Sequence, residues 1–205
     1  LIYRAHFAFI KNPRINPKGL NTSAIFGFCT SLLEVTNKFD PSHIGVVFDP
    51  PGGSDREGVF ADYKANRQEM PEDIRKAIPY IFDLLKAMNI KVEMEEGFEA
   101  DDVIGTLAKQ AEKKGFETYM MTPDKDFGQL VSDHIFIYKP GRSGNPSEIL
   151  GPKEVCEKFE VKNPLQVIDI LGLWGDAVDN IPGVPGVGEK TAKKLISTYG
   201  SIENL

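Results

Sequence analysis

The alternation of short apolar runs with longer segments of helical periodicity is the feature that most constrains the fold of this chain. The runs typical of β-strands are Ile44–Asp49, Ile90–Met94, Phe116–Thr122 and His134–Pro140. The segments with apolar residues at helical spacing are Thr22–Phe39, the stretch after Pro71, and Ala100–Gly115. Strands and helices that alternate in this way predict an α/β fold with a mostly parallel sheet flanked by helices. After Gly151 the pattern becomes helical, with a last helix expected near Glu189.

Acidic residues gather where the predicted strands end. The acids that do so, or that form a further pair towards the end of the chain, are Asp49, Glu99, Asp101, Asp102, Asp124, Asp126, Asp176 and Asp179. In open sheets of parallel strands, ligands bind beyond the carboxyl ends of the strands. Three strands that each deliver acid to one sheet edge therefore predict a shared site. We expect Asp176 and Asp179, three residues apart on a turn or helix end, to face one way.

The overall charge hides how local this acidity is. A net charge of −6, from 30 acidic and 24 basic residues, argues against a nucleic-acid partner. Without the eight clustered acids, however, 22 acidic residues face 24 basic ones. No apolar run approaches the roughly 18 residues of a membrane span, and Cys29 and Cys156 stand alone. We therefore expect no membrane partner, no disulfide, and a reducing, cytoplasmic setting.

Each acid has an ordinary explanation when it is considered singly, as a loop cap, a first helical turn or a turn after a strand. Considered together, carboxylates from separate segments suit hard divalent cations such as Mg²⁺ or Mn²⁺, because these ions take oxygen ligands and offset the repulsion between the acids. Two such ions, roughly 3.5–4 Å apart, clamp the attacking and leaving oxygens of a phosphodiester. The pattern predicts a site of this kind.

Two further segments suggest contact with phosphates. Gly183, Gly186 and Gly188 form a turn before a predicted helix that carries Lys190, Lys193 and Lys194. Backbone N–H groups at such a turn bind a DNA backbone, although a glycine-rich hairpin between packing helices with solvated lysines is the alternative. The segment 50–71 is expected to be an insertion over the acidic edge. If its Tyr63–Arg67 stretch is a short helix, Lys64 and Arg67 share a face and could hold a phosphate.

Six motifs occur in order along the chain: IYRAHFAF, VVFDPPG, YKANR, GFEADDVIG, TPDKDFGQLV and GDAVDNIPGVPGVGEKTA. In this order and spacing they cover essentially the whole chain, which resembles the 5′-nuclease domain of bacterial DNA polymerase I, of the flap endonuclease superfamily. The resemblance implies a PIN-like α/β core at residues 1–150 with a helical arch at about 50–71, and a helical region at 151–205 with a helix-three-turn-helix motif. It also implies metal-dependent 5′-3′ exonuclease and flap endonuclease activity in replication and repair.

The resemblance also implies roles for individual residues. Two divalent ions would be held, directly or through water, by Asp49, Glu99, Asp101, Asp102, Asp124, Asp126, Asp176 and Asp179. Lys64 and Arg67 would steer the scissile phosphate, and Asp49 and Asp124 would belong to the catalytic centre. DNA would be bound by Tyr3, Arg4, Phe7, Tyr63, Lys64, Arg67, Gly183, Val184, Gly186, Val187, Gly188, Lys190, Thr191, Lys193 and Lys194. The turn at Gly183–Gly188 is also where relatives hold a monovalent cation such as K⁺.

The family carries one more Asp, in a strand before the IYRAHFAF motif, and this chain begins inside that motif. We expect the chain to be a fragment at both ends, monomeric, weakly active or inactive without the upstream residues, and followed by a polymerase domain. One alternative is a DNA-binding module that is inactive as a fragment. Another is a phosphatase that uses an Asp-x-Asp pair, but such a pair is expected after the first strand, whereas Asp124 and Asp126 follow a later one.

Overall fold

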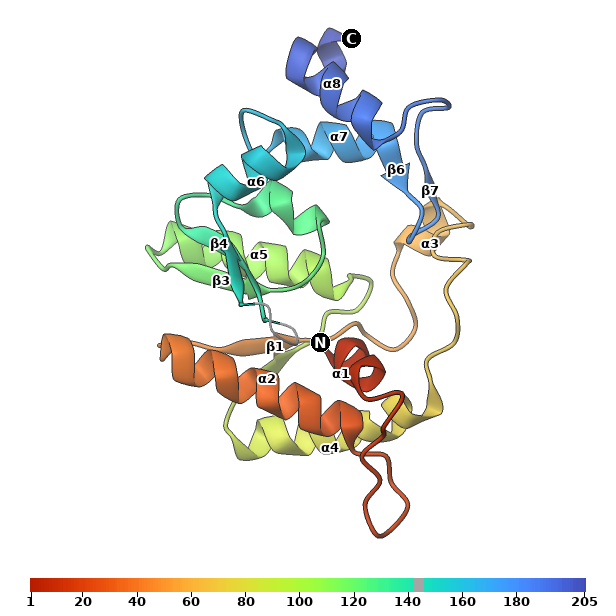
Figure 1. Cartoon of the computed structure of the whole chain (residues 1–205), viewed down its shortest axis with the longest axis vertical. Helices are drawn as coiled ribbons and strands as arrows, with labels where there is room; N and C mark the ends of the chain where they lie inside the picture. The colour runs from red at the N-terminus through yellow and green to blue at the C-terminus, as the bar shows by residue number, and fades with distance from the viewer. Residues whose placement is uncertain (142–145) are drawn as a thin grey trace. The chain divides into compact units, whose positions relative to one another are not determined.

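The computed structural model describes residues 1–141 and 146–205, which divide into two units (Figure 1). The first unit comprises Leu1–Phe48 and Gln68–Met94, and the second comprises Asp49–Arg67 and Glu95–Leu205. No helix in the part of the chain that the structure describes is long and apolar enough to cross a membrane.

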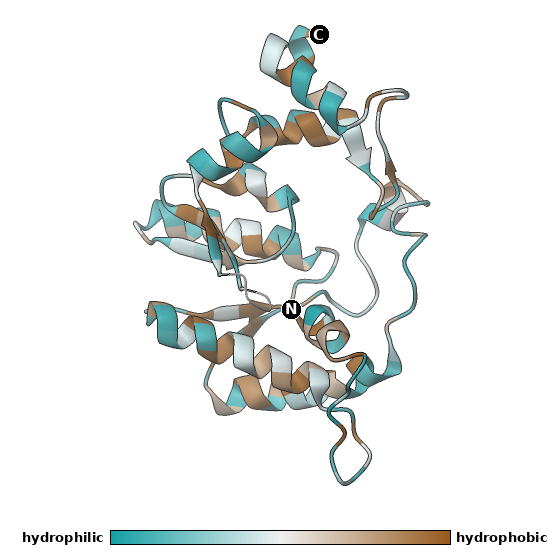
Figure 2. Cartoon of the chain, in the orientation of Figure 1, coloured by the Kyte–Doolittle hydropathy of each residue, from teal (hydrophilic) through white to brown (hydrophobic). Residues whose placement is uncertain are grey.

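The first unit contains two long helices, each of which buries one face. Its elements are α1 (Ile2–Ala8), α2 (Ser23–Phe39), β1 (Gly45–Val47), α4 (Glu72–Ala87) and β2 (Lys91–Glu93). Buried residues of α4 recur every three or four positions, at Ile74, Ala77, Ile81 and Leu85, and Ala77, Ile81 and Leu85 pack with Phe28 of α2. Figure 2 shows that both helices also carry hydrophilic residues. This amphipathic pattern places one face of each helix in the core.

The second unit contains the remaining elements. These are α3 (Arg56–Val59), α5 (Ala100–Lys113), β3 (Thr118–Met121), the 3₁₀ helix η1 (Asp126–Leu130), β4 (Ile135–Lys139), β5 (Glu148–Leu150), α6 (Pro152–Phe159), α7 (Gln166–Trp174), β6 (Gly175–Asp176), β7 (Ile181–Pro182), α8 (Glu189–Tyr199) and η2 (Ile202–Asn204). Its core joins Ile135 and Ile137 of β4 to Val167 and Ile170 of α7 and Ile196 of α8. One apolar core therefore supports both the β3–β5 sheet and the C-terminal helices.

The strands pair differently from the single mostly parallel sheet that the alternation predicts. All four predicted strands form, but β1 pairs in parallel with β2, while β3, β4 and β5 make a separate sheet. Within that second sheet β3 and β4 are parallel, and β5, which was not predicted, is antiparallel to β4. A pattern of apolar runs locates strands but does not specify their partners, because pairing is decided by contacts between distant segments.

The segment 50–71 also differs from its prediction. A short helix was expected at Tyr63–Arg67, but the helix lies earlier, at Arg56–Val59, and residues 61–66 form turns. Lys64 has a φ of 56°, which lies in the left-handed region. A right-handed helix cannot pass through such a residue. A turn, and not a helix, therefore sets the positions of the Lys64 and Arg67 side chains.

Candidate functional site

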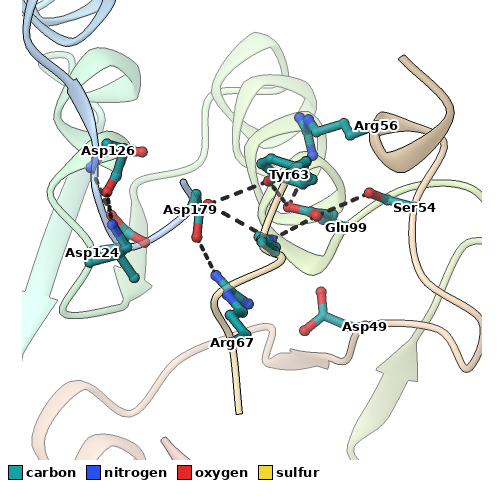
Figure 3. Close-up of polar contacts among 12 residues, drawn as sticks. Asp49, Ser54, Arg56, Tyr63, Arg67, Glu99, Asp124, Asp126 and Asp179 are labelled. Atoms are coloured by element: carbon teal, nitrogen blue, oxygen red, sulfur yellow. Dashed lines mark hydrogen bonds and ion pairs between the residues drawn. The ribbon is translucent and has the colours of Figure 1, made fainter. Parts of the chain in front are cut away.

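Glu99, the residue before α5, is the most heavily bonded carboxylate of the second unit. It is only 9% exposed. The hydroxyl groups of Ser54 and Tyr63 each donate a hydrogen bond to it at 3.0 Å, and Lys64 Nζ lies 2.7 Å from Oε1 (Figure 3). Burial raises the pKa of Glu99, but the hydrogen bonds from Lys64, Tyr63 and Ser54 outweigh burial and hold it below its ordinary value. Glu99 is therefore a fixed negative charge.

Asp179 is the second carboxylate that contacts the segment Tyr63–Arg67. Arg67 Nη2 lies 2.5 Å from its Oδ1, and Lys64 Nζ lies 3.8 Å from its Oδ2. The Tyr63 hydroxyl also reaches Asp179, at 3.4 Å, so that it spans the two carboxylates (Figure 3). We call Tyr63, Lys64, Arg67, Glu99 and Asp179 the Lys64 cluster.

Backbone contacts hold the Lys64 cluster in register. The Lys64 N–H donates to the carbonyl of Asp179 at 2.9 Å, and Asn66 Nδ2 donates to the carbonyl of Ala177 at 2.9 Å. These bonds join two segments more than a hundred residues apart in the chain. The left-handed turn at Lys64 is therefore fixed by long-range contacts.

A second lysine bridges another pair of carboxylates. Lys125 Nζ lies 2.6 Å from Asp176 Oδ2 and 3.1 Å from Asp126 Oδ1, and it stands 5.4 Å from the ring centroid of Trp174. We call Lys125, Asp126 and Asp176 the Lys125 cluster. Asp176 and Asp179 bind different bases, and the expectation that the two side chains face one way stays a prediction. Asp176 belongs to β6, whereas Asp179 lies in the turn after it.

Asp102 has the ordinary role of a helix-start acid. Its Oδ2 accepts a hydrogen bond from the Glu99 N–H at 3.1 Å, and Arg56 binds both of its oxygens, at 2.8 and 2.6 Å. Burial raises the pKa of Asp102, but the hydrogen bonds from Arg56 and from the Glu99 backbone lower it to below its usual range. Asp102 thus serves the first turn of α5, and its predicted metal ligation stays a prediction.

Three further acids lie close enough to interact. Asp49 Oδ1 accepts a hydrogen bond from the Ala100 N–H at 2.8 Å, at the start of α5. Desolvation is the largest cause that raises the pKa of Asp101, and the charges of Asp124 and Asp49 follow; together they bring it to about 6. Asp124 in turn accepts a hydrogen bond from the Asp126 N–H at 3.0 Å. These carboxylates share an excess of negative charge that a cation would relieve.

The donor chemistry of these acids fits a hard divalent cation, because all candidate ligands are carboxylate oxygens, and desolvation, followed by the charges of Asp124 and Asp49, shifts the pKa of Asp101 upward. Their present arrangement is different from a formed site. Across residues 1–141 and 146–205, no three His, Cys, Asp or Glu side chains are placed to hold a metal ion together. Lysine and arginine side chains supply the positive charge instead.

The glycine-rich turn has both structural and accessible positions. A Cβ at Gly183 would lie 2.2 Å from the carbonyl oxygen of Trp174, and one at Gly175 would lie 2.3 Å from the Gly183 nitrogen. Gly183 is thus required by close backbone packing, as the hairpin alternative supposes. Gly186 and Gly188 have open space around them, and Gly188 stands at the N-terminus of α8.

The basic residues of α8 also divide into one with structural contacts and two that are accessible. Lys193 is turned towards protein, because its Nζ lies 2.9 Å from Glu189, 3.5 Å from Glu160 and 2.9 Å from the carbonyl of Lys158. Lys190 and Lys194 are exposed. Thr191 and Val184 are exposed as well, whereas Val187 packs partly against the core. Lys193 therefore has a structural role, and its contact with DNA stays a prediction.

Tyr3, Arg4 and Phe7 lie on α1 of the first unit, whereas all other candidates belong to the second. Tyr3 is 46% exposed and Phe7 51% exposed. Three residues that contact the candidate acids were not singled out from the sequence: Ser54, Arg56 and Lys125. Lys125 had a usable signal, since it stands between two of the predicted ligands. Ser54 and Arg56 had none, because their partners are more than 40 residues away.

Comparison with known families identifies the chain. Residues 1–160 match the family described as 5′-3′ exonuclease, N-terminal resolvase-like domain, and residues 162–205 match 5′-3′ exonuclease, C-terminal SAM fold. The chain belongs to the 5′-3′ exonuclease family. An α/β core followed by a helical region is thereby confirmed.

Relatives of this exonuclease family include two kinds of protein. The chain is 43% identical over 206 residues to DNA polymerase I of Bacillus subtilis, covering 100% of the chain and 23% of the relative. It is 40% identical over 204 residues to a 5′-3′ exonuclease of Aquifex aeolicus, covering 100% of the chain and 68% of the relative. The chain thus spans about a quarter of the length of its polymerase relatives.

Solved structures share the fold at lower identity. T5 5′-exonuclease with bound zinc matches with a TM-score of 0.81 at 19% identity, covering 99% of the chain and 73% of that protein. T5 D15 flap endonuclease in complex with DNA and metal ions matches with a TM-score of 0.77 at 19% identity, over 98% of the chain and 75% of that protein. The catalytic core of Rad2 in complex with DNA substrate matches at 0.60 and 18% identity, over 97% and 59%.

Proposed function

We propose that this chain is a divalent-metal-dependent 5′-3′ exonuclease and 5′-flap endonuclease, which hydrolyses DNA phosphodiester bonds during primer removal and repair. We further propose that it forms the N-terminal domain of a cytoplasmic DNA polymerase I. The observation that carries the proposal is the pairing of carboxylates from three separate segments, Glu99 with Asp179 and Asp126 with Asp176, in a member of the 5′-3′ exonuclease family. The chain acts as a monomer on flapped, nicked or duplex-end DNA.

The acids supply the metal-binding function of this proposal. The residues that would hold two Mg²⁺ or Mn²⁺ ions are Asp49, Glu99, Asp101, Asp102, Asp124, Asp126, Asp176 and Asp179. When bound, such ions activate water and stabilise the charge on the scissile phosphate. Lys64 and Arg67 bind the phosphate and orient it for attack, a role supported by their position beside Glu99 and Asp179.

The DNA duplex is bound through its backbone in this proposal. Gly186 and Gly188, with open space around them at the start of α8, let backbone N–H groups approach a phosphate. Lys190 and Lys194 add exposed positive charge. The same turn would hold K⁺. Tyr3 and Phe7 are exposed aromatic side chains suited to contact DNA from the first unit.

Cleavage of a flap substrate tests the proposal. The chain, extended at its N-terminus to include the first-strand Asp that the family carries, is incubated with a 5′-labelled flap duplex and Mg²⁺, and the products are resolved on a denaturing gel. We expect Mg²⁺-dependent cleavage that Asp124→Ala reduces by at least about a hundredfold, because metal-assisted phosphate chemistry depends on its ligands.

The control is Asp133→Ala, which removes an acid outside the candidate set. If the chain is folded, as judged by circular dichroism, and binds DNA without cleaving it, the result would contradict the proposed nuclease activity and support a DNA-binding module instead.

A further inference from the structure

Two lysines of the second unit occupy equivalent positions, each between two carboxylates. Lys64 Nζ lies 2.7 Å from Glu99 and 3.8 Å from Asp179, and Lys125 Nζ lies 3.1 Å from Asp126 and 2.6 Å from Asp176. In both cases an ammonium group joins acids from distant parts of the chain. Each ammonium group therefore supplies a positive charge where carboxylates converge.

Neither lysine has the surroundings of an ordinary surface ion pair. The Lys64 side chain is 18% exposed and that of Lys125 is 28% exposed, whereas the surface pair of Lys76 and Glu72 is 56% and 74% exposed. Moving a charge into such a partly buried position is unfavourable unless it is paired. The four carboxylates around the two lysines would repel one another if both ammonium groups were absent.

All four of these carboxylates belong to the proposed set of metal ligands. An oxygen that holds an ammonium group at 2.6–2.7 Å is not free to bind a divalent ion in the same direction. Metal binding and the lysine contacts thus compete for the same atoms. Competition of this kind is reciprocal, because two ligands that exclude each other weaken each other equally.

We propose that Lys64 and Lys125 are exchangeable internal counter-ions, which hold the carboxylates together in the metal-free chain and are displaced when divalent ions bind. The proposal rests on the metal-dependent activity proposed above and deepens it. It gives the two lysines a role before the substrate arrives. Displacement also releases Lys64 to contact a phosphate, so that metal loading prepares the phosphate-binding side chain.

The first test measures metal affinity. Mn²⁺ is titrated calorimetrically into the wild-type chain and into Lys125→Met and Lys64→Met, at 0.1 M and 1 M salt. We expect each variant to bind Mn²⁺ about two- to fivefold more tightly than wild type, which is the size of a partly exposed ion pair. The gain persists at 1 M salt, where the screening length is about 3 Å and through-space effects between more distant charges vanish.

Lys109→Met is the matched control. Lys109 forms an ion pair of similar length, 3.2 Å, with Glu112, which is outside the acidic set. Its removal is expected to leave Mn²⁺ affinity unchanged within error. Unfolding by urea, monitored by circular dichroism without metal, verifies that each variant is folded before titration.

The second test follows Lys125 directly. Trp174 is the single tryptophan of the chain, and Lys125 Nζ lies 5.4 Å from its ring centroid. Movement of the ammonium group away from the ring changes the field at the indole and hence its fluorescence emission. We expect Mg²⁺ to shift the emission of wild type and to produce at most half of that shift in Lys125→Met.

The possible outcomes separate the two proposals. If wild type binds Mn²⁺ but both lysine variants bind it equally or more weakly, the counter-ion role is overturned and the nuclease proposal stands. If Mg²⁺ shifts the tryptophan emission of wild type and Lys125→Met equally, the displacement of Lys125 is overturned. If wild type binds no divalent ion at all, the metal-dependent function fails and the counter-ion role fails with it.

Discussion

The Lys64 cluster and the Lys125 cluster use the same chemistry but are built differently. The Lys64 cluster joins three segments, and its Glu99 side chain is 11% exposed with several donors around it. In the Lys125 cluster the lysine is adjacent in sequence to Asp126, whose side chain is 39% exposed, and only Asp176 comes from far away. The first cluster therefore holds the fold of the 50–67 segment together, whereas the second mainly neutralises charge.

Removal of Glu99 is expected to lower the free energy of unfolding more than any other change considered. A small loss would contradict the structural role given to the Lys64 cluster. Glu99→Ala removes the nearer of the two carboxylates shared by Lys64 and the Tyr63 hydroxyl, and leaves only the longer contacts with Asp179. We expect a loss of about 3 kcal/mol in the free energy of unfolding, measured by urea denaturation, because the loss of one partner leaves buried groups uncompensated.

Asp126→Ala is the matched variant in the other cluster. Its carboxylate is more exposed, so we expect a loss below about 1 kcal/mol in metal-free solution. Equal losses in the two variants would show that the two clusters contribute alike to stability, contrary to the difference in their burial.

Tyr63→Phe is expected to have an intermediate effect. Tyr63 is 8% exposed and its hydroxyl lies 3.0 Å from Glu99 and 3.4 Å from Asp179, so the variant keeps the ring and removes only these bonds. We expect a loss of about 1 kcal/mol in unfolding free energy, with DNA affinity unchanged in a fluorescence anisotropy assay. A large loss of DNA affinity instead would indicate that the hydroxyl contacts DNA, as the sequence resemblance implies for this residue.

Asp101→Asn is expected to have the smallest effect, and a stabilising one. The folded-state pKa of Asp101 is about 6, above its unfolded value, so the native chain retains this proton as pH rises and loses stability between about pH 4 and pH 6. Above that range the charged form is unfavourable in the fold. In EDTA at pH 7.5 the variant should melt at a higher temperature than wild type. The gain in the free energy of unfolding should be below about 1 kcal/mol, because solvent screens this exposed residue.

The same comparison at pH 4 is the control, since Asp101 is largely protonated in the fold there. A variant with the same advantage at both pH values would rule out the titration of Asp101 as the cause. A decrease in nuclease activity alongside the gain in stability would agree with its proposed role as a ligand.

Local features of the chain were predictable from sequence because they depend on neighbouring residues. Helices α2 and α5 begin and end close to their predicted positions, and α8 begins at the predicted Glu189, since the spacing of apolar residues and the flanking Gly and Thr residues are local signals. The first helical turn, one of the ordinary explanations for a single acid, is confirmed at Asp102, which bonds to a residue three positions away.

Contacts between distant segments were not predictable in this way. The turn at Lys64 replaces the expected helix because its N–H binds the carbonyl of Asp179, more than a hundred residues later. Lys125 stands between two predicted ligands, but nothing near it indicates that it pairs with Asp176, 51 residues away. The acids, and Lys64 and Arg67 within one motif, were found because their clustering is visible in sequence, whereas the pairing of each base with its acids is not.

The left-handed backbone of Lys64 has a consequence for protein engineering. A lysine at a φ of 56° costs about 1–2 kcal/mol relative to glycine, which adopts this conformation freely. Replacement of Lys64 by glycine would relieve this cost but would also remove the 2.7 Å ion pair with Glu99, so a saturation library at position 64 selected for thermal stability would weigh the two effects against each other. The same library selected for catalysis would, under the proposed role, return lysine alone.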